Sequence, residues 1–221
     1  MFDIQNYIDE LTERLQILFG DRLLYVGLQG SYLRGEATEN SDIDIMVVLD
    51  GLHAQDLRTY RSVIEAMVGF DKSCGFICSR EDLMHWNPLE ICHVLHSTKD
   101  YYGVLRELIP AYTEQDIRNF IKFSVNNLYH EICHRYIHAD RISNMEALPF
   151  TYKGVFFVLQ NLFYLTHGEF ITSKAALLQR LEGENRAVLE CSIAMNNGEP
   201  YDFEESFQLL LSWCQETIKS V

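Results

Sequence analysis

Positive charge is scarce in this sequence of 221 residues. It has 18 Lys and Arg residues against 32 Asp and Glu residues, so the formal net charge is −14 at pH 7. General binders of nucleic acid or anionic membranes need a positive surface, so the composition argues against both kinds of partner. An acidic surface favours cationic small molecules, and a nucleotide can still bind where a metal ion supplies positive charge.

The chain also lacks CxxC pairs and long apolar runs. Its six cysteines are scattered, which is typical of reduced and mostly buried thiols. The most apolar stretch, Val155–Leu165, contains Gln160 and Asn161 and is too short to span a bilayer. The N-terminal segment MFDIQNYIDELTERL is acidic and amphipathic, unlike a signal peptide. We therefore expect a soluble cytoplasmic protein.

Hydrophobic periodicity divides the chain into two parts, and strand patterns stop near residue 98. The spacing predicts helices over 3–19, 54–68 and 89–96, and strands over 23–28, 41–49 and 73–78. Further helices are predicted over 113–139, 150–166, 173–181, 186–195 and 203–219. Thr113 with Asp116 matches a capping box, and Ser173 suits an N-cap. We predict an α+β fold, with a small mixed-sheet domain over residues 1–98 followed by an all-α helical bundle domain over residues 99–221.

A glycine and serine directly follow the first predicted strand. Gly30 allows the backbone to approach a ligand closely, and the Ser31 hydroxyl with nearby backbone N–H groups can bind phosphate oxygens where a short helix begins. Arg34 and Gly35 follow within one turn. These residues predict a phosphate-binding turn.

The next predicted strand opens with Ser41, Asp42 and Asp44. Alternation places the two carboxylates on one face, about 7 Å apart along the strand. Two carboxylates beside bound phosphates suit Mg²⁺, which protein sites hold through one or two carboxylates and substrate phosphates. With two such ions, a site can activate an attacking oxygen and stabilise a leaving one. A chance match to the whole pattern is on the order of 10⁻⁸ per start position, given average composition.

The segment Gly-Ser-x-x-Arg-Gly-x-Ala, followed by Ser-Asp-Ile-Asp, resembles the signature of the polymerase-beta-type nucleotidyltransferase superfamily. The two-part layout is similar to that of bacterial aminoglycoside and lincosamide (kanamycin-type) nucleotidyltransferases, which confer antibiotic resistance. This resemblance implies transfer of a nucleoside monophosphate from an NTP to a hydroxyl of a small-molecule acceptor in the cleft between the two parts, with release of pyrophosphate. Gly30 and Ser31 would hold the phosphates, and Asp42 and Asp44 would bind one or two Mg²⁺ ions as the catalytic pair.

The resemblance extends to other residues of the nucleotide and acceptor sites. It implies that Arg34, Ser41 and Lys174 also bind the nucleotide. Kanamycin-type enzymes use a carboxylate of the helical part as general base, and His130 or Glu131 lies at a similar place in this chain. The alternative is a structural role, in which both residues bond to neighbours on a helix face and Lys174 is a surface lysine.

One departure from the family pattern concerns a third carboxylate, which the family usually places on a neighbouring strand. The matching strand, 73–78, has none. Asp71 and Glu81 flank it and Glu90 lies further on, and each is also explained as a solvated surface acid. An alternative function is therefore a nucleotide-binding regulatory or antitoxin-like protein with weak or lost turnover.

Three segments allow other interpretations. His130, Glu131 and His134 match the H-E-x-x-H pattern of zinc proteases, but a third ligand is required and consecutive turns of one helix converge poorly on an ion. Cys92, His93 and His96 offer metal-ligating groups, yet packing explains them more simply. The segment 99–103 matches either a family junction or a plain linker. The sequence names neither the acceptor, nor the preferred NTP, nor the oligomeric state.

Overall fold

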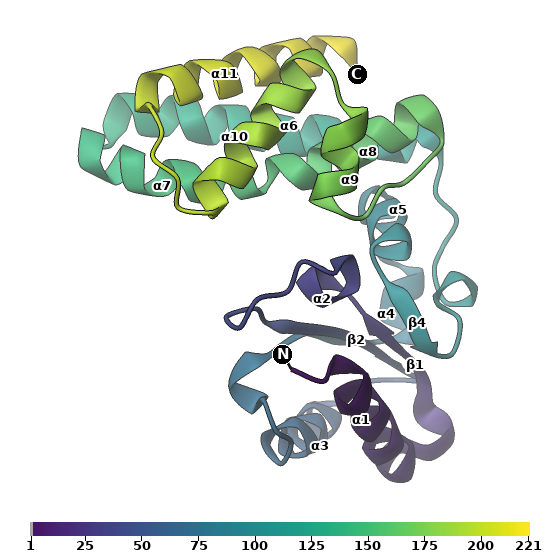
Figure 1. The fold of residues 1–221 in the computed structure, drawn as a ribbon. Helices are drawn as coiled ribbons and strands as arrows, with labels where there is room; N and C mark the ends of the chain where they lie inside the picture. Colours follow the sequence, from purple (N-terminus) through teal and green to yellow (C-terminus); the bar gives the residue numbers. More distant parts are fainter. Residues whose placement is uncertain (1) are drawn as a thin grey trace. The chain divides into compact units, whose positions relative to one another are not determined.

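The computed structural model describes residues 2–221, which form two compact units, residues 2–112 and Thr113–Val221 (Figure 1). The first contains a sheet and the second is built from helices. The prediction of an α+β fold with a small mixed sheet and a helical region is confirmed.

The sheet of the first unit has four strands in the order β3-β2-β1-β4. Their bounds are β1 (Leu23–Leu28), β2 (Ile43–Leu49), β3 (Ser73–Ser79) and β4 (Lys99–Tyr102). β1 pairs antiparallel with both β2 and β4, whereas β2 and β3 are parallel, so the sheet is mixed.

Helices and short 3-10 turns connect these strands. The helices are α1 (Ile4–Phe19), α2 (Gly30–Arg34), α3 (Ala54–Glu65), α4 (Arg80–Met84) and α5 (Pro88–His96). The 3-10 turns are η1 (Gly20–Arg22), η2 (Phe70–Lys72) and η3 (Leu105–Glu107). The short α4 was not among the predicted helices; its N-cap is Ser79, whose hydroxyl accepts a hydrogen bond from the backbone N–H of Asp82.

β2 is buried on both faces beyond its first residues. Ile43, Ile45 and Val47 face the core formed with α1, and Met46 and Val48 face a second core around Tyr25. Both cores exclude water from the strand, which explains its nearly continuous apolar sequence. Polar residues are confined to the start of the strand, where Asp42 and Asp44 lie.

The segment Lys99–Tyr102 forms the edge strand β4, where strand patterns were not expected. Val26, Gly27 and Leu28 of β1 pair with it, and the Tyr25 hydroxyl donates a hydrogen bond of 2.7 Å to Asp100. Because this pairing adds 99–102 to the sheet, the first unit extends to Tyr112 instead of ending at residue 98.

The second unit is helical throughout residues 113–221. Its helices are α6 (Glu114–His138), α7 (Arg141–Lys153), α8 (Val155–His167), α9 (Lys174–Arg180), α10 (Gly183–Asn196) and α11 (Phe203–Ser220). The predicted caps are confirmed: Thr113 and Asp116 form a capping box, and the Ser173 hydroxyl accepts from the backbone N–H of Ala176. The side chains of Tyr152, Phe156 and Trp213 are among the most deeply buried.

The single helix predicted over 150–166 is wrong in its start. Two helices, α7 and α8, meet at Gly154, whose φ of −68° and ψ of −26° remain helical. Pro149 lies inside α7. Proline disfavours a helix interior, yet α7 continues through it.

Within residues 2–221, none of the helices combines the length and apolar character needed to cross a bilayer.

Candidate functional site

The Gly-Ser turn lies where β1 passes into α2. Gln29 is extended and caps the helix, and Gly30 begins it with a φ of +68°, a value that strongly favours glycine. The backbone N–H of Gln29 donates a 2.9 Å hydrogen bond to the backbone oxygen of Asp44 on β2. This bond joins the end of β1 to the start of β2 and brings Gly30 next to Asp44.

The Asp44 carboxylate lies in the space that a Cβ atom at Gly30 would occupy. A Cβ atom at residue 30 would stand 1.9 Å from Oδ2 of Asp44 and 2.8 Å from its Cγ. Real Cβ atoms essentially never come this near another atom, so a side chain at residue 30 would displace the Asp44 carboxylate. The predicted close approach of the Gly30 backbone to a ligand stays a prediction; the contact that the structure shows is with Asp44.

Asp42 and Asp44 lie on one face at the start of β2. Asp42 is exposed and Asp44 is half-buried. Among residues 2–221, no Lys, Arg or His lies within ion-pair distance of either carboxylate. Adjacent carboxylates without a basic partner suit a divalent cation, which neutralises both. The same part of the chain contains no group of three or more His, Cys, Asp or Glu arranged to hold a metal, so phosphate oxygens would have to complete the coordination.

The residue that faces Asp44 from the neighbouring strand is Cys74. The parallel register of β2 and β3 pairs Asp44 with Cys74 and Ile43 with Ser73. Burial raises the pKa of the Cys74 thiol, and the negative charges of Asp44 and Asp42 raise it further. A thiol therefore stands where the resemblance leads one to look for a carboxylate.

None of the three candidate acids lies on β3. Asp71 is exposed in η2 just before the strand, and Glu81 is exposed in α4 beyond its opposite end. Glu90 lies on α5 and accepts a hydrogen bond from the indole N–H of Trp86. The pairing register brings none of them opposite Asp44.

Arg34 and Ser41 are engaged within the α2–β2 connection. Nε of Arg34 forms a 2.9 Å ion pair with Glu36. The Ser41 hydroxyl accepts a 2.8 Å hydrogen bond from the backbone N–H of Thr38. Both side chains thus stabilise the loop that leads to Asp42, and their predicted nucleotide-binding role stays a prediction.

The remaining predicted residues lie on the second unit. Glu131 on α6 accepts a 3.2 Å hydrogen bond from the Thr151 hydroxyl on α7. His130 lies on α6 too, and its ring centre lies 6.1 Å from that of His134. Lys174, the first residue of α9, has its Nζ 5.7 Å from the centre of the Phe156 ring.

Comparison with known proteins bears on these observations. A family model described as a nucleotidyltransferase domain matches residues 8–73, which include the Gly-Ser turn and the Asp pair. A provisionally named protein adenylyltransferase from Methanocaldococcus jannaschii is 31% identical over 106 residues, which cover 45% of this chain and 71% of that protein. The chain belongs to the nucleotidyltransferase family.

The fold of this nucleotidyltransferase is also similar to a solved structure. The spectinomycin adenyltransferase AAD(9) from Enterococcus faecialis, solved with ATP and spectinomycin, superimposes with a TM-score of 0.60 at 16% sequence identity. The match covers 97% of this chain and 99% of the other. At this level of identity the similarity establishes the shared fold.

The Cys-His-x-x-His segment of the nucleotidyltransferase lies on α5. Cys92 is fully buried, and burial raises the pKa of its thiol to about 11. Burial, with the nearby Arg34 charge, lowers the pKa of His93 to about 4. Nε2 of His96 lies 3.1 Å from the Tyr112 hydroxyl. Both the burial of Cys92 and the neutral state of His93 at pH 7 agree with packing in the first unit.

Two residues near the turn had no signal in the sequence. Gln29 donates a 2.8 Å hydrogen bond from Nε2 to Thr98, which ties the Gly-Ser turn to the start of β4. Cys74 stands opposite Asp44 because of a pairing between strands that no local pattern specifies. In both cases the partner is far away along the chain, so spacing alone gives no indication.

Proposed function

We propose that this nucleotidyltransferase moves a nucleoside monophosphate from a Mg²⁺-bound NTP to a hydroxyl of a small-molecule acceptor and releases pyrophosphate. The observation that carries the proposal is the contact of Gly30 with Asp44. It joins a turn suited to phosphate to a carboxylate pair suited to Mg²⁺, within a single unit.

Each residue of the turn and the pair has a role in this proposal. The backbone at Gly30 and the Ser31 hydroxyl donate hydrogen bonds to the β- and γ-phosphates. Asp42 and Asp44 hold Mg²⁺, which supplies positive charge that stabilises the transition state and the leaving pyrophosphate. The acceptor oxygen bonds to the α-phosphorus while the bond from that phosphorus to the pyrophosphate oxygen breaks.

The acceptor hydroxyl must also lose a proton. His130 and Glu131 remain the two candidates for the base, both on α6. Glu131 has its carboxylate oriented by the Thr151 hydroxyl, as expected for a base held by a second group. An imidazole suits proton transfer near neutral pH, which keeps His130 in consideration.

A small cationic acceptor and ATP are supported by two observations. The fold neighbour AAD(9) was solved with ATP and spectinomycin. The net charge of −14 attracts cations. We therefore propose an aminoglycoside-type acceptor, in line with antibiotic-resistance transferases.

A second candidate is transfer to a protein hydroxyl. It is favoured by the name of the Methanocaldococcus jannaschii relative, which aligns over 106 residues. In that case a partner protein would take the place of the small acceptor, as in antitoxin-like proteins that modify a helical partner.

Pyrophosphate release tests these functions directly. The purified protein is given Mg²⁺, each of the four NTPs in turn and a panel of aminoglycosides and spectinomycin, with Asp42→Asn as the control. Release that depends on both Asp42 and an added small molecule supports the first function and names the acceptor class. Label from α-³²P-ATP that appears on a co-purifying protein supports the second. Binding of Mg²⁺-NTP without any release contradicts both and favours a regulatory protein.

A further inference from the structure

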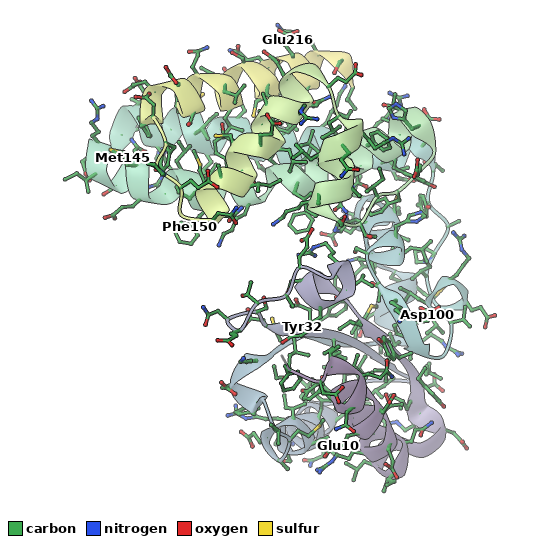
Figure 2. All side chains as sticks on the ribbon, in the orientation of Figure 1. Glu10, Tyr32, Asp100, Met145, Phe150 and Glu216 are labelled. Carbon is green, nitrogen blue, oxygen red and sulfur yellow. The ribbon has the colours of Figure 1, made fainter. Side chains whose placement is uncertain are left out.

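A cavity of about 660 Å³ lies in the first unit next to the Gly-Ser turn. The loop 37–40 forms one side, and Phe2, Tyr32 and Lys72 form the rest. In Figure 1 the start of the chain comes near the loop after α2, and Figure 2 labels Tyr32 in the same region. Pockets that bind drug-sized ligands have volumes of roughly 300–1,000 Å³, so the cavity is large enough for a ligand.

Two aromatic rings make its apolar side. The ring centres of Phe2 and Tyr32 lie 6.2 Å apart, and the planes meet at 67°. The Phe2 ring also lies next to the Tyr7 ring, and the two ring centres are 5.5 Å apart. Planar ligands gain from contact with such ring faces and edges, because aromatic groups prefer stacked or edge-to-face neighbours.

A lysine supplies the positive charge of the cavity. Nζ of Lys72 donates a 2.6 Å hydrogen bond to the backbone oxygen of Glu39, which leaves two N–H groups of the ammonium. No carboxylate lies within ion-pair distance of this ammonium in residues 2–221. A half-buried lysine without a carboxylate partner stands out in a chain of net charge −14 and suits an anion.

Other polar groups of the wall are Asn40 and Glu39. The side-chain amide of Asn40 offers donors and an acceptor and makes no hydrogen bond with the described part of the chain, whereas its backbone N–H donates to the Thr38 hydroxyl. The Glu39 carboxylate is exposed at the rim, where solvent screens it, and it opposes an anion only weakly.

The cavity is separate from the Asp pair. Phe2 and Tyr32 pack against the core on the Ile43 side of β2, and a Cβ at Gly69 would touch both Phe2 and Ile43. Asp42 and Asp44 project from the opposite face because successive side chains of a strand alternate. The Asp44 side chain therefore points to the face of β2 opposite to that of Ile43, which packs with Phe2 and Tyr32.

We propose that this cavity is a second ligand site, which takes a small anion bearing a planar ring, such as a nucleoside monophosphate. The ring lies against Phe2 and Tyr32, the anionic group bonds to the Lys72 ammonium, and the Asn40 amide contacts the edge of the ring. The site is independent of the proposed transfer reaction, and it remains if that reaction is disproved.

Calorimetric titration of the full chain with AMP, in the presence of a metal chelator, tests the proposal. We expect one AMP per chain. Adenosine, which lacks the anion, and ribose 5-phosphate, which lacks the ring, should each bind about tenfold more weakly than AMP. Equal affinity for AMP and ribose 5-phosphate, or no AMP binding, would overturn the assignment.

Matched variants locate the bound AMP. Lys72→Met should weaken binding about tenfold, Lys72→Arg should keep it, and Glu39→Gln should strengthen it slightly. Lys99→Met on the opposite edge of the sheet removes the same charge and should change nothing. Asp44→Asn and Ser31→Ala should also leave AMP affinity unchanged. If these last two variants abolish binding while Lys72→Met does not, AMP occupies the Gly-Ser turn and the proposal is wrong.

Discussion

The carboxylate of Asp44 fills the space that a side chain at residue 30 would occupy, since a Cβ there would lie 1.9 Å from Oδ2. Gly30 and Asp44, which are separated along the chain by the rest of α2 and a loop, therefore constrain each other's position. A change at Gly30 should act on the chemistry of Asp44 as well as on the backbone.

Gly30→Ala should abolish transfer, because the new methyl group displaces Asp44. Gly35→Ala is the matched control: its φ of +70° is nearly the same as the +68° of Gly30, but a Cβ at residue 35 would meet no atom within 4 Å. Both variants should lose about 1 kcal/mol of stability from backbone strain, and only Gly30→Ala should lose pyrophosphate release. Equal activity of the two would show that the contact has no catalytic importance.

Asp42→Asn and Asp44→Asn should each remove transfer while the fold is kept. Neither carboxylate has a basic partner in residues 2–221, so the substitutions break no ion pair of the folded chain. Circular dichroism and urea unfolding should match the parent, and pyrophosphate release should be lost. Turnover retained in both variants would refute the metal assignment.

His130→Gln and Glu131→Gln separate the two candidate bases. Loss of a general base lowers kcat by about 10²–10⁴-fold and leaves the KM for NTP nearly unchanged. Steady-state kinetics should show this loss in one variant alone. If neither shows it, the base lies elsewhere.

Cys74→Asp should supply a carboxylate directly opposite Asp44. Added ligand charge strengthens divalent-cation binding, so the Mg²⁺ concentration for half-maximal rate should fall severalfold. Cys74→Ser controls for loss of the thiol and should leave that concentration unchanged. A requirement for more Mg²⁺ in Cys74→Asp would show that this position does not face the metal.

The ion pair of Arg22 with Asp56 should make stability depend on pH. Nη1 and Nη2 of Arg22 donate hydrogen bonds of 3.0 and 2.7 Å to the Asp56 carboxylate. These hydrogen bonds hold the pKa of Asp56 below its usual 3.8. The ion pair contributes fully to the free energy of unfolding above pH 3.8. That contribution is lost as the pH falls through the lowered pKa of Asp56 in the folded state.

Urea unfolding of Asp56→Asn and of the parent checks this dependence. The parent should be more stable at pH 7, and the difference should shrink as the pH falls below the unfolded-state value. Glu65→Gln, which breaks the exposed Arg61–Glu65 pair, should have a much smaller effect at pH 7. A difference for Asp56→Asn that is the same at pH 7 and in acid would contradict the pKa argument.

Local patterns predicted much of the fold. The helices capped by Thr113 and Ser173 have their signals within one turn, and β2 follows an alternation that Asp42 and Asp44 begin. Lys99–Tyr102, in contrast, has little apolar alternation and becomes a strand because β1 supplies its hydrogen bonds. The start of α7 was missed, and this helix contains Pro149, a residue that disfavours a helix interior.

The candidate site shows the same division. Gly30, Ser31, Asp42 and Asp44 stand in one short segment, so their type and spacing indicate phosphate and metal chemistry. The thiol opposite Asp44 and the bond from Gln29 to Thr98 depend on strand pairing over long sequence separations. Local spacing does not encode such contacts, which is why they came only from the structure.

The edge strand β4 has a consequence for how the protein is made. Tyr25 and Asp100, which are hydrogen-bonded, are 75 positions apart in the sequence. A nascent chain that has emerged from the ribosome only as far as β3 leaves one side of β1 without its partner, exposing backbone groups and apolar surface. The sheet that carries the Gly-Ser turn is therefore complete only once residue 102 has emerged, well after β1, β2 and β3.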